Sequence, residues 1–306
     1  MTSFAAMSLR CVLLAAAGAA WLVSPAHGAA GERDDDPHKR LVIGGDCQGC
    51  DFADSNLASA QFLGGDFSSA DFSHAELLGA RMADMTLMGA DFSNTSMTEA
   101  RLTSVTFGGA DLSDADFQRA RLHRVDFAGA RLERTDLTGA VMMQVGFAGA
   151  DLGGAQARDA VLRQADFTGA DLRGARFDQS HFFSAALNAA DLRGASLSGV
   201  IFERADLSSA DFRGAELTGA RFISVNLTGA DFRSAEGLNP QNFHQSCGAD
   251  VAGLPGDMVM QACQAVPLRS PDQAESARAA AYAASRETRR AALNEARAAI
   301  EAAIAE

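Results

Sequence analysis

Residues 110–129 read ADLSDADFQRARLHRVDFAG, which is four units of five residues with a large apolar side chain at every fifth position. The same rule holds from Phe52 to Phe232, where 37 such positions hold 17 Leu, 16 Phe, three Met and one exception, Ala157. Two residues earlier the side chain is small, with Ala in 25 cases and Val in five. A period of five fits neither a helix nor a strand. It predicts a small coil whose chain turns after each unit, and coils must stack because no unit can bury its own central residue.

A second period of twenty residues predicts the number of sides in one coil. The residues just before the central positions fall, at this period, into columns of different chemistry. One column holds Asp at nine of its ten positions between 51 and 231, and another runs from Gln61 to Arg221 without an acidic residue. Residues twenty apart therefore share an environment. We expect four units and four faces per coil, and about nine coils stacked over roughly 45 Å at the spacing of hydrogen-bonded strands.

With these repeats, residues 41–240 resemble the pentapeptide repeat family. The resemblance implies a β-solenoid, a right-handed quadrilateral β-helix. The start at Cys47-Gln-Gly-Cys50 and the end at Gly237-Leu-Asn-Pro240 are also similar to members of that family. The resemblance is specific for the fold but weak for function, because a repeat is a scaffold that carries many functions.

The N-terminal residues 1–28 have the layout of a signal peptide. Arg10 is followed by thirteen uncharged residues, Cys11–Val23, and then by small residues around Gly28, where we expect cleavage. A bilayer-spanning helix needs about 20 apolar residues, so the run is short for a membrane span, although an uncleaved anchor is the alternative. The sequence thus predicts a protein that is exported, periplasmic or secreted, without a transmembrane segment after processing. Its low content of Lys and its richness in Arg and Ala suggest a bacterial source. A polar linker follows at 29–40.

The C-terminal part leaves the repeat. Residues 241–271 are expected to form a cap, and the Ala-rich segment 272–306 contains no Gly or Pro and predicts one α-helix that begins near a capping Asp272. Its apolar stripe is thin. The helix could lie along an apolar face of the solenoid, pair with another copy, or project into solvent.

The column that begins at Gln61 contains the candidate interaction face. Outward apolar residues are rare elsewhere on the repeats but gather here at Val141, Met143, Val161, His181, Phe183, Ile201 and Ile223. We expect one apolar stripe with a rim of Arg121, Arg163, Arg204 and Arg221. Exposed apolar patches of this kind mark interfaces. The chain's own C-terminal segment, a protein partner and a second subunit are the possible occupants, and a patch without a role is the remaining reading.

The Asp column has arginines two residues later at Arg173, Arg193, Arg213 and Arg233. This pattern predicts a solvated lattice of salt bridges at the C-terminal end. Between positions 51 and 111 no Arg accompanies the Asp, and an acidic ridge for a cation or a basic partner is the alternative there.

Four cysteines remain after export, and an even count in an oxidising compartment favours disulfides. We expect Cys247–Cys263 to close the cap, and Cys47–Cys50 is a second candidate, both of whose residues face inward by register. A redox role would need an exposed, activated thiolate at a helix start, and no βαβ pattern is present. The histidines are scattered and no catalytic motif occurs. The sequence predicts no enzyme, no cofactor and no metal site.

The chain has 26 basic and 39 acidic residues, a net charge of −13. It therefore lacks the basic surface that nucleic-acid-binding proteins usually have, and we expect no direct nucleic-acid binding. The first hypothesis is an exported, non-catalytic scaffold that binds an unknown protein partner or itself. The family resemblance implies an alternative, an acidic rod that mimics duplex DNA and binds DNA gyrase or another nucleic-acid-binding protein. The export signal argues against this alternative, because gyrase is cytosolic.

Overall fold

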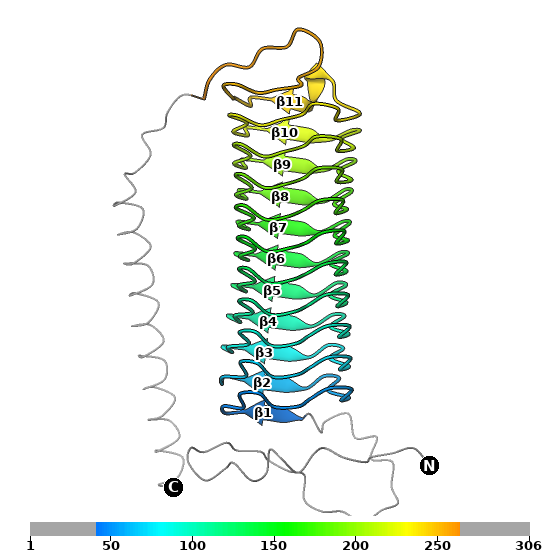
Figure 1. Cartoon of the computed structure of the whole chain (residues 1–306), viewed down its shortest axis with the longest axis vertical. Helices are drawn as coiled ribbons and strands as arrows, with labels where there is room; N and C mark the ends of the chain where they lie inside the picture. Colours follow the sequence, from blue (N-terminus) through cyan, green and yellow to red (C-terminus); the bar gives the residue numbers. More distant parts are fainter. Residues whose placement is uncertain (1–40, 264–306) are drawn as a thin grey trace, which may run out of the picture. The chain divides into compact units, whose positions relative to one another are not determined.

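The computed structural model describes residues 41–263, which form a parallel β-solenoid. Eleven short strands stack in sequence order along one side of it (Figure 1). They are β1 Val42–Gly44, β2 Gln61–Leu63, β3 Arg81–Ala83, β4 Arg101–Thr103, β5 Arg121–His123, β6 Val141–Met143, β7 Val161–Arg163, β8 His181–Phe183, β9 Ile201–Glu203, β10 Arg221–Ile223 and β11 Phe243–His244. The expected signal peptide 1–28, the linker 29–40 and the helix 272–306 lie outside the described residues.

Three further rows of single parallel bridges run along the solenoid, so each coil has four sides. They begin at Asp51↔Asp71, Asn56↔Glu76 and Asp66↔Thr86 and continue with a period of twenty residues. We call the side formed by the strands, together with the corner residue after each strand, the strand face. The side formed by the row from Asp51 is the Asp face, and it lies two corners away, on the opposite side of the coil.

The eleven strands bound ten coils, one more than the nine expected, because pairing continues past both ends of the regular repeat. The first coil has 19 residues, from Val42 to its partner Gln61. The last has 21, from Ile223 to its partner His244. There the 3-10 helix η1, Pro240–Asn242, forms the corner and is capped by Asn239, whose side chain accepts from the Gln241 N–H.

Phenylalanine rings stack along the axis and fill the core. Each ring lies over the residue twenty positions on, with centroids 4.5 Å apart for Phe72 and Phe92 and 4.6 Å apart for Phe147 and Phe167. Offset stacking at such distances adds about 0.5–1.5 kcal/mol per pair beyond the burial itself. Ala157 is fully buried at a central position, as its register requires.

Three of the four corners are turns closed by a backbone hydrogen bond, such as that from the Ser55 N–H to the Phe52 carbonyl at 3.2 Å. The residue before the closing N–H has a positive φ, for example 55° at Asp54. The residue before each central position stabilises the next turn when it is Asp or Asn. The Oδ1 of Asp71, for example, accepts the Ser73 N–H at 2.9 Å. This Asx turn explains why Asp recurs in the unit.

Candidate functional site: the strand face

The outward side chains of the strand face form two parallel files, one from the first and one from the third residue of each strand. In the first file Val141, Val161, His181 and Ile201 are consecutive in-register neighbours. Arg121 precedes them and Arg221 follows. Over these four coils the first file, here called the apolar file, therefore holds three aliphatic side chains and His181. Val141 is 37% exposed and the other three side chains are half-buried.

The second file alternates apolar and charged residues, which differs from the expected stripe with an arginine rim. Its order is Met143, Arg163, Phe183, Glu203 and Ile223. Arg163 thus lies between two apolar side chains rather than at the edge. The guanidinium groups of Arg163 and Arg204 both lie 5.7 Å from the centre of the Phe183 ring, within the range of a cation–π contact.

His181 is the one titratable side chain within the apolar file. Its Nε2 lies 3.4 Å from Oε2 of Glu203, which is too long for a strong hydrogen bond, and the atom is shielded from solvent. The imidazole meets the Phe183 ring edge-on, with centroids 6.3 Å apart. His181 of the first file and Glu203 of the second file therefore lie close to each other.

Charge separates strongly between the faces. Within residues 46–235 the strand face carries seven of the 16 arginines and two of the 26 acidic residues, a net charge of +5 against −15 for the rest of those repeats. Its charged residues are Arg81, Arg101, Arg121, Arg124, Arg163, Arg204, Arg221, Asp84 and Glu203. Sequence reasoning noted that one column lacked acids but missed this asymmetry. Counting the corner residues with each column would have found it.

At the C-terminal end of the Asp face, Arg173, Arg193 and Arg213 each bridge two aspartates and Arg233 pairs with Asp231, which is the expected lattice. Arg213 lies 2.6 Å from Asp211 in its own coil and 3.7 Å from Asp231 in the next. The hydrogen bond from Arg213 is the main cause of a lowered pKa at Asp211, partly opposed by desolvation. Arg173, Arg193 and Arg233 similarly lower the pKa of Asp171, Asp191 and Asp231.

The N-terminal end of the Asp face is different. Asp51, Asp71 and Asp91 each accept a backbone N–H two residues on, at 3.1, 2.9 and 2.8 Å. Within residues 41–263 none of the three forms an ion pair. Their outer oxygens therefore remain available to a cationic group.

Two disulfides join Cys47 to Cys50 and Cys247 to Cys263, with Cα atoms 5.5 and 4.8 Å apart. The first lies in the opening coil, where Cys50 is buried and Cys47 half-buried against the core. The second ties the cap to its last coil, beside the hydrogen bond from the Gly248 N–H to the Gln261 carbonyl. Both pairs stabilise an end of the solenoid, where a coil lacks one neighbour.

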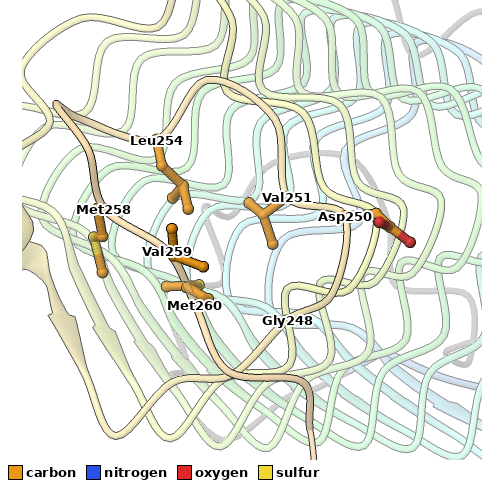
Figure 2. Close-up of a pocket in the computed structure, with 7 residues that line it drawn as sticks. All are labelled: Gly248, Asp250, Val251, Leu254, Met258, Val259 and Met260. Carbon is orange, nitrogen blue, oxygen red and sulfur yellow. The ribbon is translucent and has the colours of Figure 1, made fainter.

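The cap also contains a shallow hollow, shown in Figure 2, with Val251, Leu254 and Met260 around it. Its volume of about 170 Å³ is well below the 300–1,000 Å³ or so of ligand pockets. Among the described residues no three His, Cys, Asp or Glu side chains are placed to hold a metal ion. In the same part of the chain no helix is long and apolar enough to cross a membrane.

Comparison with known proteins gives two family matches. A model described as a pentapeptide repeat region matches residues 100–177, and one of pentapeptide repeats matches 43–73, 66–103, 185–222 and 201–236. No curated protein matches the sequence.

Solved structures of three repeat proteins are similar to this chain. HetL, involved in heterocyst differentiation regulation in the cyanobacterium Nostoc sp. strain PCC 7120, is 28% identical with a TM-score of 0.35, over 71% of this chain and 91% of HetL. A protein from the Arabidopsis thaliana thylakoid lumen is 35% identical with a TM-score of 0.33, over 34% and 72%. QnrB1, a plasmid-mediated fluoroquinolone resistance protein, is 20% identical with a TM-score of 0.31, over 56% and 85%.

Proposed function

The chain belongs to the pentapeptide repeat family, and we propose that it is an exported, non-catalytic scaffold that binds a protein through its strand face. The occupant is a partner protein or a second copy. The observation that carries this proposal is the continuous file Val141, Val161, His181 and Ile201. At the matching positions of the other faces the side chains are mostly Asp, Ser, Thr or Gly.

A binding role fits the physical character of this file. Four partly exposed side chains at about 4.8 Å intervals form a straight, rigid ridge, because parallel backbone pairing fixes their spacing. Interfaces combine an apolar centre with a polar rim, and arginine is enriched in them. Here Arg121 and Arg221 bound the file at its two ends, and Arg163 and Arg204 flank it around Phe183.

Export is supported by two separate features. The N-terminal residues have the signal-peptide pattern described above, and the described residues contain two disulfides, which persist in oxidising compartments. Cell fractionation tests this part, with recovery in the soluble cytosolic fraction as the contrary result.

The positive strand face weighs against the alternative of a duplex-DNA mimic. Duplex DNA presents negative charge on every side. Here one of four faces has a net charge of +5, so the negative surface is interrupted along the whole solenoid.

The binding proposal is tested with Val161→Asp and Ile201→Asp, singly and together. Phe183 is a poorer probe, because Arg163 and Arg204 already lie within cation–π range of its ring. We expect loss of partner capture by crosslinking in the native cell, or of self-association by light scattering, with an unchanged circular dichroism spectrum. Ala186→Asp is the matched control on another face, at the same position of its unit. Equal binding by the double variant and the wild type would overturn the proposal.

A further inference from the structure

Three arginines at the N-terminal end of the strand face form a ladder without ion pairs among the described residues. Arg81, Arg101 and Arg121 are the first residues of β3, β4 and β5 and are in-register neighbours. All three are exposed, and within the described residues none takes part in an ion pair. Like charges directly opposite each other on a sheet are destabilising. Three arginines stacked at about 4.8 Å intervals repel one another, and an anionic partner that binds them removes this repulsion.

A ladder of the opposite sign lies on the opposite face and begins nearer the N-terminal end of the solenoid. Asp51, Asp71 and Asp91 are bridge partners in one row, and each uses a single carboxylate oxygen for its Asx turn. Because the two ladders lie on opposite sides of the coil, they cannot neutralise each other within one molecule.

In the C-terminal coils, arginines and aspartates lie on the same face and form ion pairs with each other. There Arg193 lies 2.6 Å from Asp191 and 3.7 Å from Asp211, and the pattern repeats from coil to coil. In the N-terminal coils the positions of these arginines hold small residues, Ala53, Ser73 and Ser93. The carboxylates of Asp51, Asp71 and Asp91 are therefore accessible to arginines of another molecule.

We propose that Arg81, Arg101 and Arg121 of one copy bind Asp51, Asp71 and Asp91 of a second copy, so that molecules associate side by side. The spacing supports this occupant, because both ladders have the period of the same coil and each guanidinium can meet a carboxylate. A strand of duplex DNA places phosphates about 3.4 Å apart along its axis, which does not match that period.

The neighbouring side chains allow close approach of the two faces. Ala83 stands beside Arg81, Thr103 beside Arg101 and His123 beside Arg121, and beside the aspartates stand Ala53, Ser73 and Ser93. Apart from His123 these flanking side chains are small, and guanidinium–carboxylate pairs are the stronger class of hydrogen bond.

The contact joins two different faces, so it is heterologous and adds molecules in an open row unless rotation closes it. It lies on β3–β5, whereas the apolar file of the proposed function lies on β6–β9. The two proposals share only Arg121, which bounds that file, so the aspartate variant and Val161→Asp test them separately.

The test uses the chain purified as the producing cell leaves it, and two neutralised variants. One is Arg81→Gln/Arg101→Gln/Arg121→Gln. The other is Asp51→Asn/Asp71→Asn/Asp91→Asn, which keeps the Asx turns, because Asn56 and Asn226 already form them through Oδ1. Circular dichroism melts check that both variants fold.

Sedimentation and light scattering at about 100 µM then measure the mass. In 20 mM salt we expect the wild type to exceed the monomer mass at least twofold, and to return to monomer in 0.5 M salt, where screening is strong. Each variant alone is monomeric. Their mixture forms a 1:1 dimer and nothing larger, because one supplies only carboxylates and the other only guanidinium groups.

Three results would overturn the proposal. They are a monomeric wild type in 20 mM salt, a mixture of variants without a dimer, and association that survives in both variants. Association that is instead lost with Val161→Asp belongs to the apolar file. Wild type that stays monomeric but binds poly-glutamate or duplex DNA through the three arginines would show a different anionic partner.

Discussion

Oδ1 of Asp151 accepts a hydrogen bond from the backbone N–H of Gly153 at 3.0 Å. The same bond joins Asp126 to Ala128 and Asp206 to Ser208, on another face of the solenoid. The acidic residue of the repeat is therefore part of the turn that ends its own side of the coil. Its negative charge is a by-product of that role wherever no arginine is near, which accounts for the acidic surface of three faces.

This relationship predicts different costs for two substitutions of Asp151. Asp151→Ala removes the acceptor and should lower the free energy of unfolding by about 1 kcal/mol, the usual value of such a bond. Asp151→Asn keeps Oδ1 and should cost less than half as much. Urea unfolding followed by circular dichroism measures both. Equal losses would show that charge, not the turn, is what matters at this position.

Ala157 should be a weak point of the core. Stacking fixes the distance to Leu137 and Phe177 in the neighbouring coils, so the walls cannot close around the small side chain. We expect Ala157→Leu to raise the unfolding midpoint, since a missing large side chain costs about 2–5 kcal/mol when the site does not collapse. A lower midpoint would mean that the Phe177 ring already fills the space, because overpacking costs about 1–3 kcal/mol. Phe177→Leu combined with Ala157→Leu should then restore stability.

Ala189 is held in the left-handed region, with φ of 56°. This conformation costs a residue with a Cβ about 1–2 kcal/mol, and glycine occupies the corresponding position at Gly149 and Gly169. Ala189→Gly should therefore raise the free energy of unfolding by up to about 1 kcal/mol after the extra entropy of the unfolded chain is counted, and the thermal midpoint should rise with it. The control is Ala186→Gly, three residues earlier and outside the positive-φ positions, which should lower it. Two shifts of the same sign would contradict the strain argument.

The Arg–Asp lattice should make stability fall in acid. The pKa of Asp211 and Asp231 is lowered in the folded state, chiefly by hydrogen bonds from Arg213 and Arg233. A lowered folded pKa contributes stability that is present above the unfolded value, about 3.9, and is lost as pH falls through the folded pKa. We therefore expect the thermal midpoint to fall once the pH is lowered below about 4.

Arg213→Gln should make this acid-dependent drop smaller, while the midpoint at pH 7 changes little, because exposed pairs contribute modestly. Arg124→Gln serves as the control, since within residues 41–263 Arg124 has no ion pair, and it should leave the pH dependence unchanged. Identical acid profiles for Arg213→Gln and the wild type would refute the role of the lattice.

The sequence alone determined the fold, the four sides of the coil and the inward set, including buried Ala157. It also located the lattice of Arg173, Arg193, Arg213 and Arg233. Each of these follows from the two periods, since parallel stacking carries a residue to the same place twenty positions later. Within the described residues the period fails at the end coils of 19 and 21 residues, and in the last of them η1 replaces a regular corner.

Only the tertiary structure decided how the long side chains on the strand face are used. The repeat places Arg163, Phe183 and Arg204 on one face, but packing puts both guanidinium groups over the ring and so breaks the second apolar file. It also showed that Arg81, Arg101 and Arg121 find no acid within the described residues, while Arg213 binds two. The physical reason is reach: an arginine spans more than one coil spacing. Its partner therefore depends on which neighbouring coil presents a carboxylate at the right distance, and a sequence period does not encode that distance.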